Sequence, residues 1–176
     1  MRLPTRDTRP STLSVDSLED RMMLSTVKII AAGSENTETM QLRINNQTVQ
    51  ARNNVGGNAN TGQFQTFTWS TPDTITADQV RVFFTNDNFD PANGIDANLR
   101  VDAIIIDGTR FETESASVFS TGTWRAEDGI VAGNRQSEFL HVAGYFQYAG
   151  SGDNGSTQIT VNARGTTGQE LSLIHI

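Results

Sequence analysis

The sequence predicts an all-β protein, an antiparallel β-sandwich of the jelly-roll type. Short apolar runs recur along the chain between turn residues, and no window has the 3.6-residue period of a long amphipathic helix. Hydrophobic residues make up only 36% of the chain, and 15 glycines with many Asn, Thr and Ser residues favour short strands joined by turns. Strands that follow one another without helices between them pack as a sandwich or jelly roll.

The predicted strands begin at residue 27. Residues 27–32 form an apolar run that ends at Gly33, and residues 40–44 alternate apolar and polar side chains, as in a half-buried strand. Asn45-Asn46 and Asp107-Gly108 are typical turn dipeptides. Further strands are expected at 48–49, 64–69, 80–84, 99–106, 117–120 and 139–148.

Composition excludes several classes of function. The formal net charge of -7 opposes binding to nucleic acid, because phosphate backbones would be repelled. The absence of cysteine excludes disulfides and thiolate metal sites. No stretch approaches 18 apolar residues, so no membrane span and no membrane partner are expected. The length suits one domain, which we expect to be a monomeric module.

Residues 1–25 are predicted to be a separate, disordered leader or targeting segment. They lack the apolar centre of roughly 7–15 residues that a secretory signal needs. Residues 18–25, Leu-Glu-Asp-Arg-Met-Met-Leu-Ser, resemble the LEPR-XLL N-terminal motif of exported bacterial proteins. The resemblance implies an extracellular or cell-surface location. The alternative is a short leader with a helical turn that arises by chance.

The segments after the main domain indicate a tandem arrangement. Residues 26–148 are predicted to be the β-sandwich, and 149–158 a flexible linker rich in Gly and Ser. Residues 159–176 read as the truncated start of a second similar module, because Ala31, Gly33 and Glu38 recur at one offset as Ala163, Gly165 and Glu170. Coincidence between two strands is the alternative. The last six residues fit this register poorly, and His175 is assigned no function.

Residues 86–98 carry three carboxylates and four amides within thirteen residues between two predicted strands. Calcium binds six to eight oxygens from such groups in flexible geometry. Asp87, Asp90 and Asp96 would repel one another, and a divalent cation would relieve that repulsion. The spacing does not match an EF-hand. The alternative is a solvated loop, since Asn, Asp and Gly are common in turns.

Residues 120–129 place Trp124 in a polar loop that contains Gly122 and Gly129. An exposed indole suits the apolar C–H face of a sugar, while nearby Asp and Asn side chains suit its hydroxyl groups. The alternative is a Trp folded back over the core, where most Trp residues lie. Trp69, inside a strand pattern, is assigned to the core.

Five segments in order, 86–87, 96–102, 120–124, 136–141 and 144–146, resemble the calcium-dependent xylan-binding modules of carbohydrate-binding module family 60 and its relative, family 36. The resemblance covers about 27–148. It implies a jelly-roll sandwich in which a bound Ca²⁺ contacts sugar hydroxyls beside an aromatic side chain.

Carried over by position, the resemblance implies that Asp87 and Asp96 are calcium ligands. Asn98 belongs to the metal site, and both Asn86 and Asn98 support the loop. Trp124 is the stacking platform, Asp128 accepts a sugar hydroxyl, and Asn86 is grouped with the carbohydrate-binding residues. Family members often carry a Cys pair near positions 130 and 142. Both positions are apolar here, which predicts packing in place of a disulfide and leaves the rigidity of the Trp124 loop open.

The sequence therefore predicts non-catalytic, calcium-dependent binding of a polysaccharide, xylan or a related plant or algal glycan, by a module of a larger exported protein. Xylose, galactose and glucose units all remain candidates. One alternative is a structural or adhesion β-sandwich that binds no sugar, and another is a glycoside hydrolase fragment, which needs two carboxylates across a cleft. The chain offers acidic residues but no Ser/His/Asp arrangement with a nucleophile motif.

Overall fold

The computed structural model describes residues 24–150. Most of the predicted leader and linker, and all of the predicted second module at 159–176, lie outside the described residues and stay predictions. Within 24–150, no helix is long and apolar enough to cross a bilayer. The only helical element in this range is one 3₁₀ turn, η1 (Ala77–Gln79).

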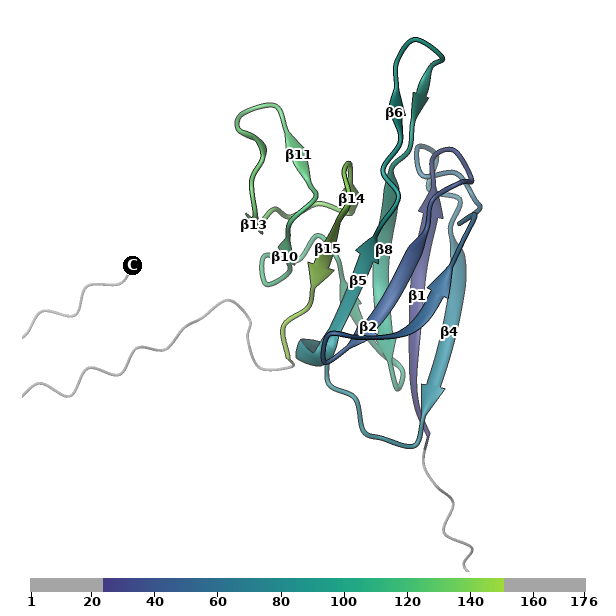
Figure 1. Ribbon diagram of the computed structural model, residues 1–176. Helices are drawn as coiled ribbons and strands as arrows, with labels where there is room; N and C mark the ends of the chain where they lie inside the picture. The colour runs from purple at the N-terminus through teal and green to yellow at the C-terminus, as the bar shows by residue number, and fades with distance from the viewer. Residues whose placement is uncertain (1–23, 151–176) are drawn as a thin grey trace, which may run out of the picture.

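The described chain forms an antiparallel β-sandwich, as predicted (Figure 1). One sheet has the strand order β14-β8-β1-β4, with β9 also paired to β8, and the other has the order β13-β10-β15-β5-β2-β3. The first sheet contains β1 (Ser25–Gly33), β4 (Gln65–Thr71), β8 (Leu99–Ile106), β9 (Thr109–Glu112) and β14 (Phe139–Leu140). The second contains β2 (Met40–Ile44), β3 (Gln47–Arg52), β5 (Val80–Phe84), β10 (Phe119–Ser120), β13 (Gly133–Asn134) and β15 (Gly144–Gln147).

The core lies between the two sheets and follows the period-2 pattern of the sequence. In β2 and β5, buried and half-buried residues alternate strictly, so one face of each strand points inward. The largest fully buried side chains include Tyr148, Phe84, Phe146, Ile29 and Met40. Burial of each large apolar side chain stabilises the fold by about 1.5–3 kcal/mol. Trp69 packs against this core from β4, as predicted.

The predicted turn dipeptides close hairpins. Asn45 and Asn46 between β2 and β3 have φ of 49° and 67°, and Asp107 and Gly108 between β8 and β9 have φ of 49° and 88°. Positive φ at both central residues is the type I′ geometry that matches strand twist. Other predicted boundaries shift: β1 begins at Ser25, and the run at 139–148 divides into β14 and β15.

Two small hairpins extend beyond the upper end of the sandwich in Figure 1. We call them the calcium arm, β6 (Phe89–Asp90) with β7 (Ile95–Asp96), and the tryptophan arm, β11 (Trp124–Arg125) with β12 (Gly129–Ile130). The calcium arm joins β5 of one sheet to β8 of the other. Residues 86–98 were predicted as a loop, and they instead contain this short β-ladder.

Candidate functional site

The register of the calcium arm decides which of its side chains lie together. The backbone N–H of Ala97 donates to the carbonyl of Asn88 over 2.9 Å, and the next pair along the ladder is Phe89 opposite Asp96. Hydrogen-bonded and non-hydrogen-bonded pairs alternate in an antiparallel ladder, so Phe89 and Asp96 form a non-hydrogen-bonded pair. Their side chains therefore lie close together on one face.

Asp87 and Asp96 are brought together, as the sequence predicted. Partial burial raises the pKa of the Asp87 carboxyl above its ordinary value, and the negative charge of Asp96 raises the pKa further. Asp90 lies apart from them in the turn, where its carboxylate accepts a hydrogen bond of 2.6 Å from the side-chain amide of Asn93. The arm thus presents Asp87 and Asp96 as a pair of repelling carboxylates, whereas Asp90 stabilises the turn through its bond to Asn93.

Asn98 is 9% exposed and has one unused oxygen. Its Nδ2 donates to the backbone carbonyl of Asp96 over 2.9 Å, and its backbone N–H donates to Oγ of Ser34 over 2.8 Å. Its Oδ1 is buried and has no hydrogen-bond partner among residues 24–150. Buried polar atoms are nearly always paired, so an orphaned oxygen marks a position for a water or an ion.

The loop between β1 and β2 holds this segment in place. Oγ of Ser34 also lies 2.7 Å from the carbonyl of Asp96, which shares the single hydroxyl proton with Oε1 of Glu38. Ser34 is in turn fixed by the fully buried Glu38, whose Oε1 accepts from the backbone N–H and the hydroxyl of Ser34 over 2.8 and 3.0 Å. A Cβ at Gly33 would lie 2.1 Å from Oε2 of Glu38, so this position has room for glycine alone.

Asn86 has a supporting role in the loop. Its Oδ1 accepts from the backbone N–H of Thr39, and its Nδ2 donates to the carbonyl of Thr37 over 2.8 Å. Both ends of the amide are therefore occupied by the β1–β2 loop. These bonds support the expected role of Asn86 in holding the loop, and its place among the carbohydrate-binding residues stays a prediction.

Trp124 is exposed, as a stacking platform must be. The side chain is 51% exposed, which excludes the alternative that it is folded over the core. Its backbone N–H donates to Nδ1 of His141 over 3.1 Å. The two rings meet edge to face, with centroids 6.4 Å apart and planes inclined by 69°.

His141 connects the two arms, and sequence reasoning missed this role. Leu140 pairs with Leu99, so His141 continues the β14 register beside Asn98. Partial burial lowers the pKa of His141 below its ordinary value, and the negative charge of Asp96 opposes this shift. Because a neutral imidazole that accepts at Nδ1 carries its proton on Nε2, His141 has one N–H donor left.

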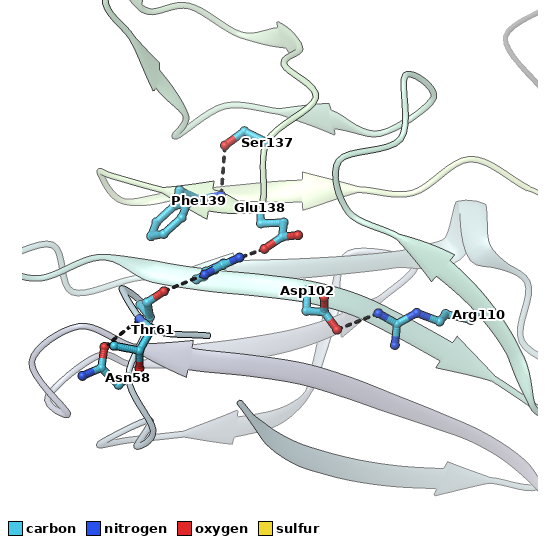
Figure 2. A network of polar contacts seen from close by, with 9 residues as sticks. Asn58, Thr61, Asp102, Arg110, Ser137, Glu138 and Phe139 are labelled. Carbon is cyan, nitrogen blue, oxygen red and sulfur yellow. Dashed lines mark hydrogen bonds and ion pairs between the residues drawn. The ribbon is translucent and has the colours of Figure 1, made fainter. Parts of the chain in front are cut away.

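Strand β14, which ends just before His141, is anchored by an ion pair next to it. Nε of Arg100 donates to Oε2 of Glu138 over 2.5 Å, and Nη1 of Arg100 donates to the carbonyl of Ala59 over 2.9 Å (Figure 2). The ring of Phe139 stacks on His141 with centroids 5.5 Å apart. Glu112 likewise pairs with Arg110. The carboxylates of Glu138 and Glu112 are thus both engaged with arginines.

Asp128 lies within the tryptophan arm but is occupied. Its two carboxylate oxygens accept from the two terminal nitrogens of Arg135, one of them over 2.6 Å. This pairing lowers the pKa of Asp128. The predicted role as a sugar hydroxyl acceptor would compete with Arg135. Ile130 is 41% exposed and Val142 is half-buried, so packing in place of a disulfide stays a prediction. The ion pair and the Trp124–His141 bond connect the arm to neighbouring segments.

The donor set of the candidate site consists of oxygens. Among residues 24–150, no three His, Cys, Asp or Glu side chains are grouped so that they could hold a metal by themselves. Asp87 and Asp96 supply two carboxylates, and Oδ1 of Asn98 adds a buried amide oxygen. Calcium accepts carboxylate, amide and backbone carbonyl oxygens together, so this mixed set fits it.

The chain is similar to known carbohydrate-binding modules. The model of the family CBM60, described as a calcium-dependent, xylan-binding carbohydrate-binding module, matches residues 26–121. A solved structure described as "vCBM60 in complex with galactobiose" is 27% identical, with a TM-score of 0.54, and the match covers 70% of this chain and 96% of that one. No curated protein matches the chain.

A second solved structure, a selenomethionine form of vCBM60, is 29% identical, with a TM-score of 0.54. The match covers 72% of this chain and 91% of that one. Its description concerns circular permutation as an evolutionary link between two families of calcium-dependent carbohydrate-binding modules. The match to nearly the whole of both solved chains shows that the likeness extends over an entire module.

Proposed function

Because the chain belongs to the carbohydrate-binding module family CBM60, we propose that it binds a polysaccharide through a calcium ion at the calcium arm and catalyses no reaction. The observation that carries the calcium proposal is the buried, unpartnered Oδ1 of Asn98, in the segment that also carries two carboxylates that repel each other. A divalent cation satisfies the oxygen and removes the repulsion at the same time.

Asp87, Asp96 and Asn98 would hold the cation. When bound, Ca²⁺ supplies a positive charge with coordination positions that sugar hydroxyl oxygens can fill. Ser34 and Glu38 keep the carbonyl of Asp96 and the backbone of Asn98 in place, so the three donors are preorganised. Little conformational entropy is then lost on binding, which favours affinity.

Trp124 would orient the sugar ring. Its exposed indole offers a flat apolar face, and His141 accepts a hydrogen bond from the backbone of the arm. The Nε2–H of His141, whose ring contacts the indole, provides a neutral donor suited to a sugar hydroxyl. The site thereby combines an apolar platform, a neutral donor and a cation, the three features that a neutral polyhydroxylated ligand uses.

We propose xylan or a related plant or algal glycan as the ligand. The family is described as xylan-binding, and a related structure was solved with galactobiose. Vicinal ring hydroxyls are common to xylose, galactose and glucose units. A cation that binds these hydroxyls can therefore bind more than one kind of glycan chain. The net charge of -7 adds a preference for neutral glycans over acidic ones.

We also propose that the chain acts outside the cell as a monomeric module of a larger exported protein. The LEPR-XLL-like residues 18–25 and the polysaccharide ligand support this location. Fusing residues 1–25 to a reporter, in a bacterium that processes this motif, tests the proposed extracellular location. Retention of the fusion in the cytoplasm would contradict it.

The proposed binding is tested by isothermal titration of the protein with xylan, xylo-oligosaccharides and galactobiose in Ca²⁺ and in excess EDTA. We expect binding in Ca²⁺ alone and no release of reducing sugar in either condition. Unchanged binding in EDTA would contradict the calcium site. Lack of binding on a broad glycan array would favour the adhesion alternative, and release of reducing sugar would favour the hydrolase alternative.

A further inference from the structure

Phe89 is the most exposed large apolar side chain among residues 24–150, at 66%. It opens strand β6 of the calcium arm. Isolated exposed apolar residues are common and need no explanation by themselves. The location of Phe89 is what distinguishes it from the exposed Leu24, which precedes β1.

Phe89 shares a face of the arm with the candidate calcium ligand Asp96. Its cross-strand partner in the non-hydrogen-bonded pair is Asp96, so the ring and the carboxylate lie side by side. Asp87 precedes it by two residues and lies near enough to Asp96 for the charge of Asp96 to raise its pKa. A phenyl ring gains little from a carboxylate partner, so pairing within the arm does not account for this aromatic residue.

Trp124 reaches the same site from the other arm. Its ring contacts His141, and the charge of Asp96 acts on His141. Phe89 has no ring partner within residues 24–150, so the two exposed aromatics do not stack on each other. The two rings belong to different arms, so each can contact a different residue of a glycan chain.

From this placement we infer that Phe89 is a second stacking platform, which contacts the sugar residue next to the one held at the cation. The site then recognises at least two consecutive residues of a glycan chain. The inference rests on the proposed function and deepens it, because it specifies an oligosaccharide as the smallest ligand that uses the whole site.

The test compares affinities for xylose, xylobiose, xylotriose and xylotetraose, or for galactose and galactobiose, in Ca²⁺. In the wild type, we expect affinity to rise from the monosaccharide to the disaccharide by about 2- to 10-fold, the range for one aromatic stacking contact. F89A should lose this rise and keep the monosaccharide affinity. F89W should retain it, because a flat face is restored, whereas F89L should not.

Two controls separate this role from folding. L24A removes an exposed apolar side chain away from the arms and should leave every affinity unchanged. The rise in melting temperature on addition of Ca²⁺ should be the same in F89A as in the wild type. If F89A kept the wild-type dependence on chain length, or weakened monosaccharide and disaccharide binding equally, the second platform would be refuted. Absence of calcium-dependent binding in the wild type would overturn the proposed function as well.

Discussion

The backbone N–H of Trp124 donates a hydrogen bond to Nδ1 of His141 over 3.1 Å, and this bond requires that Nδ1 carry no proton. Burial lowers the pKa of His141, with an opposing influence from Asp96, so the neutral form is favoured in the folded protein. The geometry of the tryptophan arm is thereby linked to the protonation state of one histidine.

We expect the calcium-free protein to lose stability as the pH falls from about 7.5 through the ordinary histidine pKa of about 6.5. The unfolded chain takes up a proton at that pH, whereas the folded chain resists it until the pH is lower. The unfolded state therefore binds more protons in this window, and stability rises with pH there. Melting temperatures measured by circular dichroism across this range check the direction.

His141→Asn is the matched variant, because its amide oxygen can accept from Trp124 without titrating. It should lose this part of the pH dependence. His175→Asn, at the other histidine of the chain, serves as the control and should keep the wild-type profile. An equal slope in the wild type and His141→Asn would show that His141 is not the responsible group.

Asp87→Asn should have effects of opposite sign with and without calcium. Burial and the charge of Asp96 raise the pKa of Asp87 in the folded state, so its ionised form destabilises the calcium-free fold at neutral pH. The amide removes that penalty, and we expect a higher melting temperature than the wild type in EDTA. In Ca²⁺ the variant should lose most of the stabilisation that ligand binding gives.

Asp90→Asn provides the comparison for Asp87→Asn, because Asp90 lies in the turn of the same arm and pairs with Asn93. It should retain most of the response to calcium. Differential scanning calorimetry in EDTA and at several Ca²⁺ concentrations measures both effects. A calcium response of wild-type size in Asp87→Asn would remove Asp87 from the ligand set.

The sequence was sufficient for the sandwich because its strands alternate in burial with period 2, as β2 and β5 show. It also predicted the exposure of Trp124 from the polar, Gly-containing loop. Both predictions rest on local patterns, which a single chain displays directly. The pairing of Asp87 with Asp96 followed from their common loop.

The role of His141 and the ion pair of Asp128 depend on contacts between distant segments. His141 contacts Trp124 because β14 pairs with β8, and no local sequence pattern predicts the register of that pairing. Asp128 was expected to face a sugar, and its partner Arg135 lies beyond β12 on the return of the chain. In the sequence, the only indication of this ion pair was that Arg135 follows the turn residue Gly129.

Asp128 and Arg135 should act as one unit in a double-mutant cycle. Because both carboxylate oxygens bind Arg135, we expect Asp128→Ala and Arg135→Ala each to weaken glycan binding by loosening the tryptophan arm, with no further loss in the double variant. If Asp128 instead bound the sugar directly, Arg135→Ala would free its carboxylate and leave affinity equal or higher. Titration of the four proteins with one oligosaccharide distinguishes the two.

A chain shortened to begin at Leu24 should fold as the full chain does, whereas one that begins at Thr26 should be less stable. Ser25 lies within β1, donates to Oδ2 of Asp107 over 3.0 Å and accepts from the backbone N–H of Ile75 over 3.3 Å. Loss of two such bonds costs roughly 1–3 kcal/mol. Urea unfolding of both chains measures the difference, and equal midpoints would contradict it.

Trp124→Ala should abolish most glycan binding while the fold stays intact. The side chain is 51% exposed, so its removal leaves no large core cavity, and surface changes of this kind usually shift stability by less than about 0.5 kcal/mol. Stacking contributes about 0.5–1.5 kcal/mol beyond area burial, and the area adds to it, so we expect a loss of roughly tenfold or more.

The other tryptophan of the chain provides the matched control. Trp69 packs against the core from β4, so Trp69→Ala should lower the free energy of unfolding and leave the affinity of the folded protein unchanged. Trp69→Phe would leave Trp124 as the sole tryptophan, whose fluorescence should shift on glycan binding because the sugar covers the indole. A stable Trp124→Ala protein with wild-type affinity for every bound glycan would refute the platform, because it would show that the Trp124 side chain contributes nothing to binding.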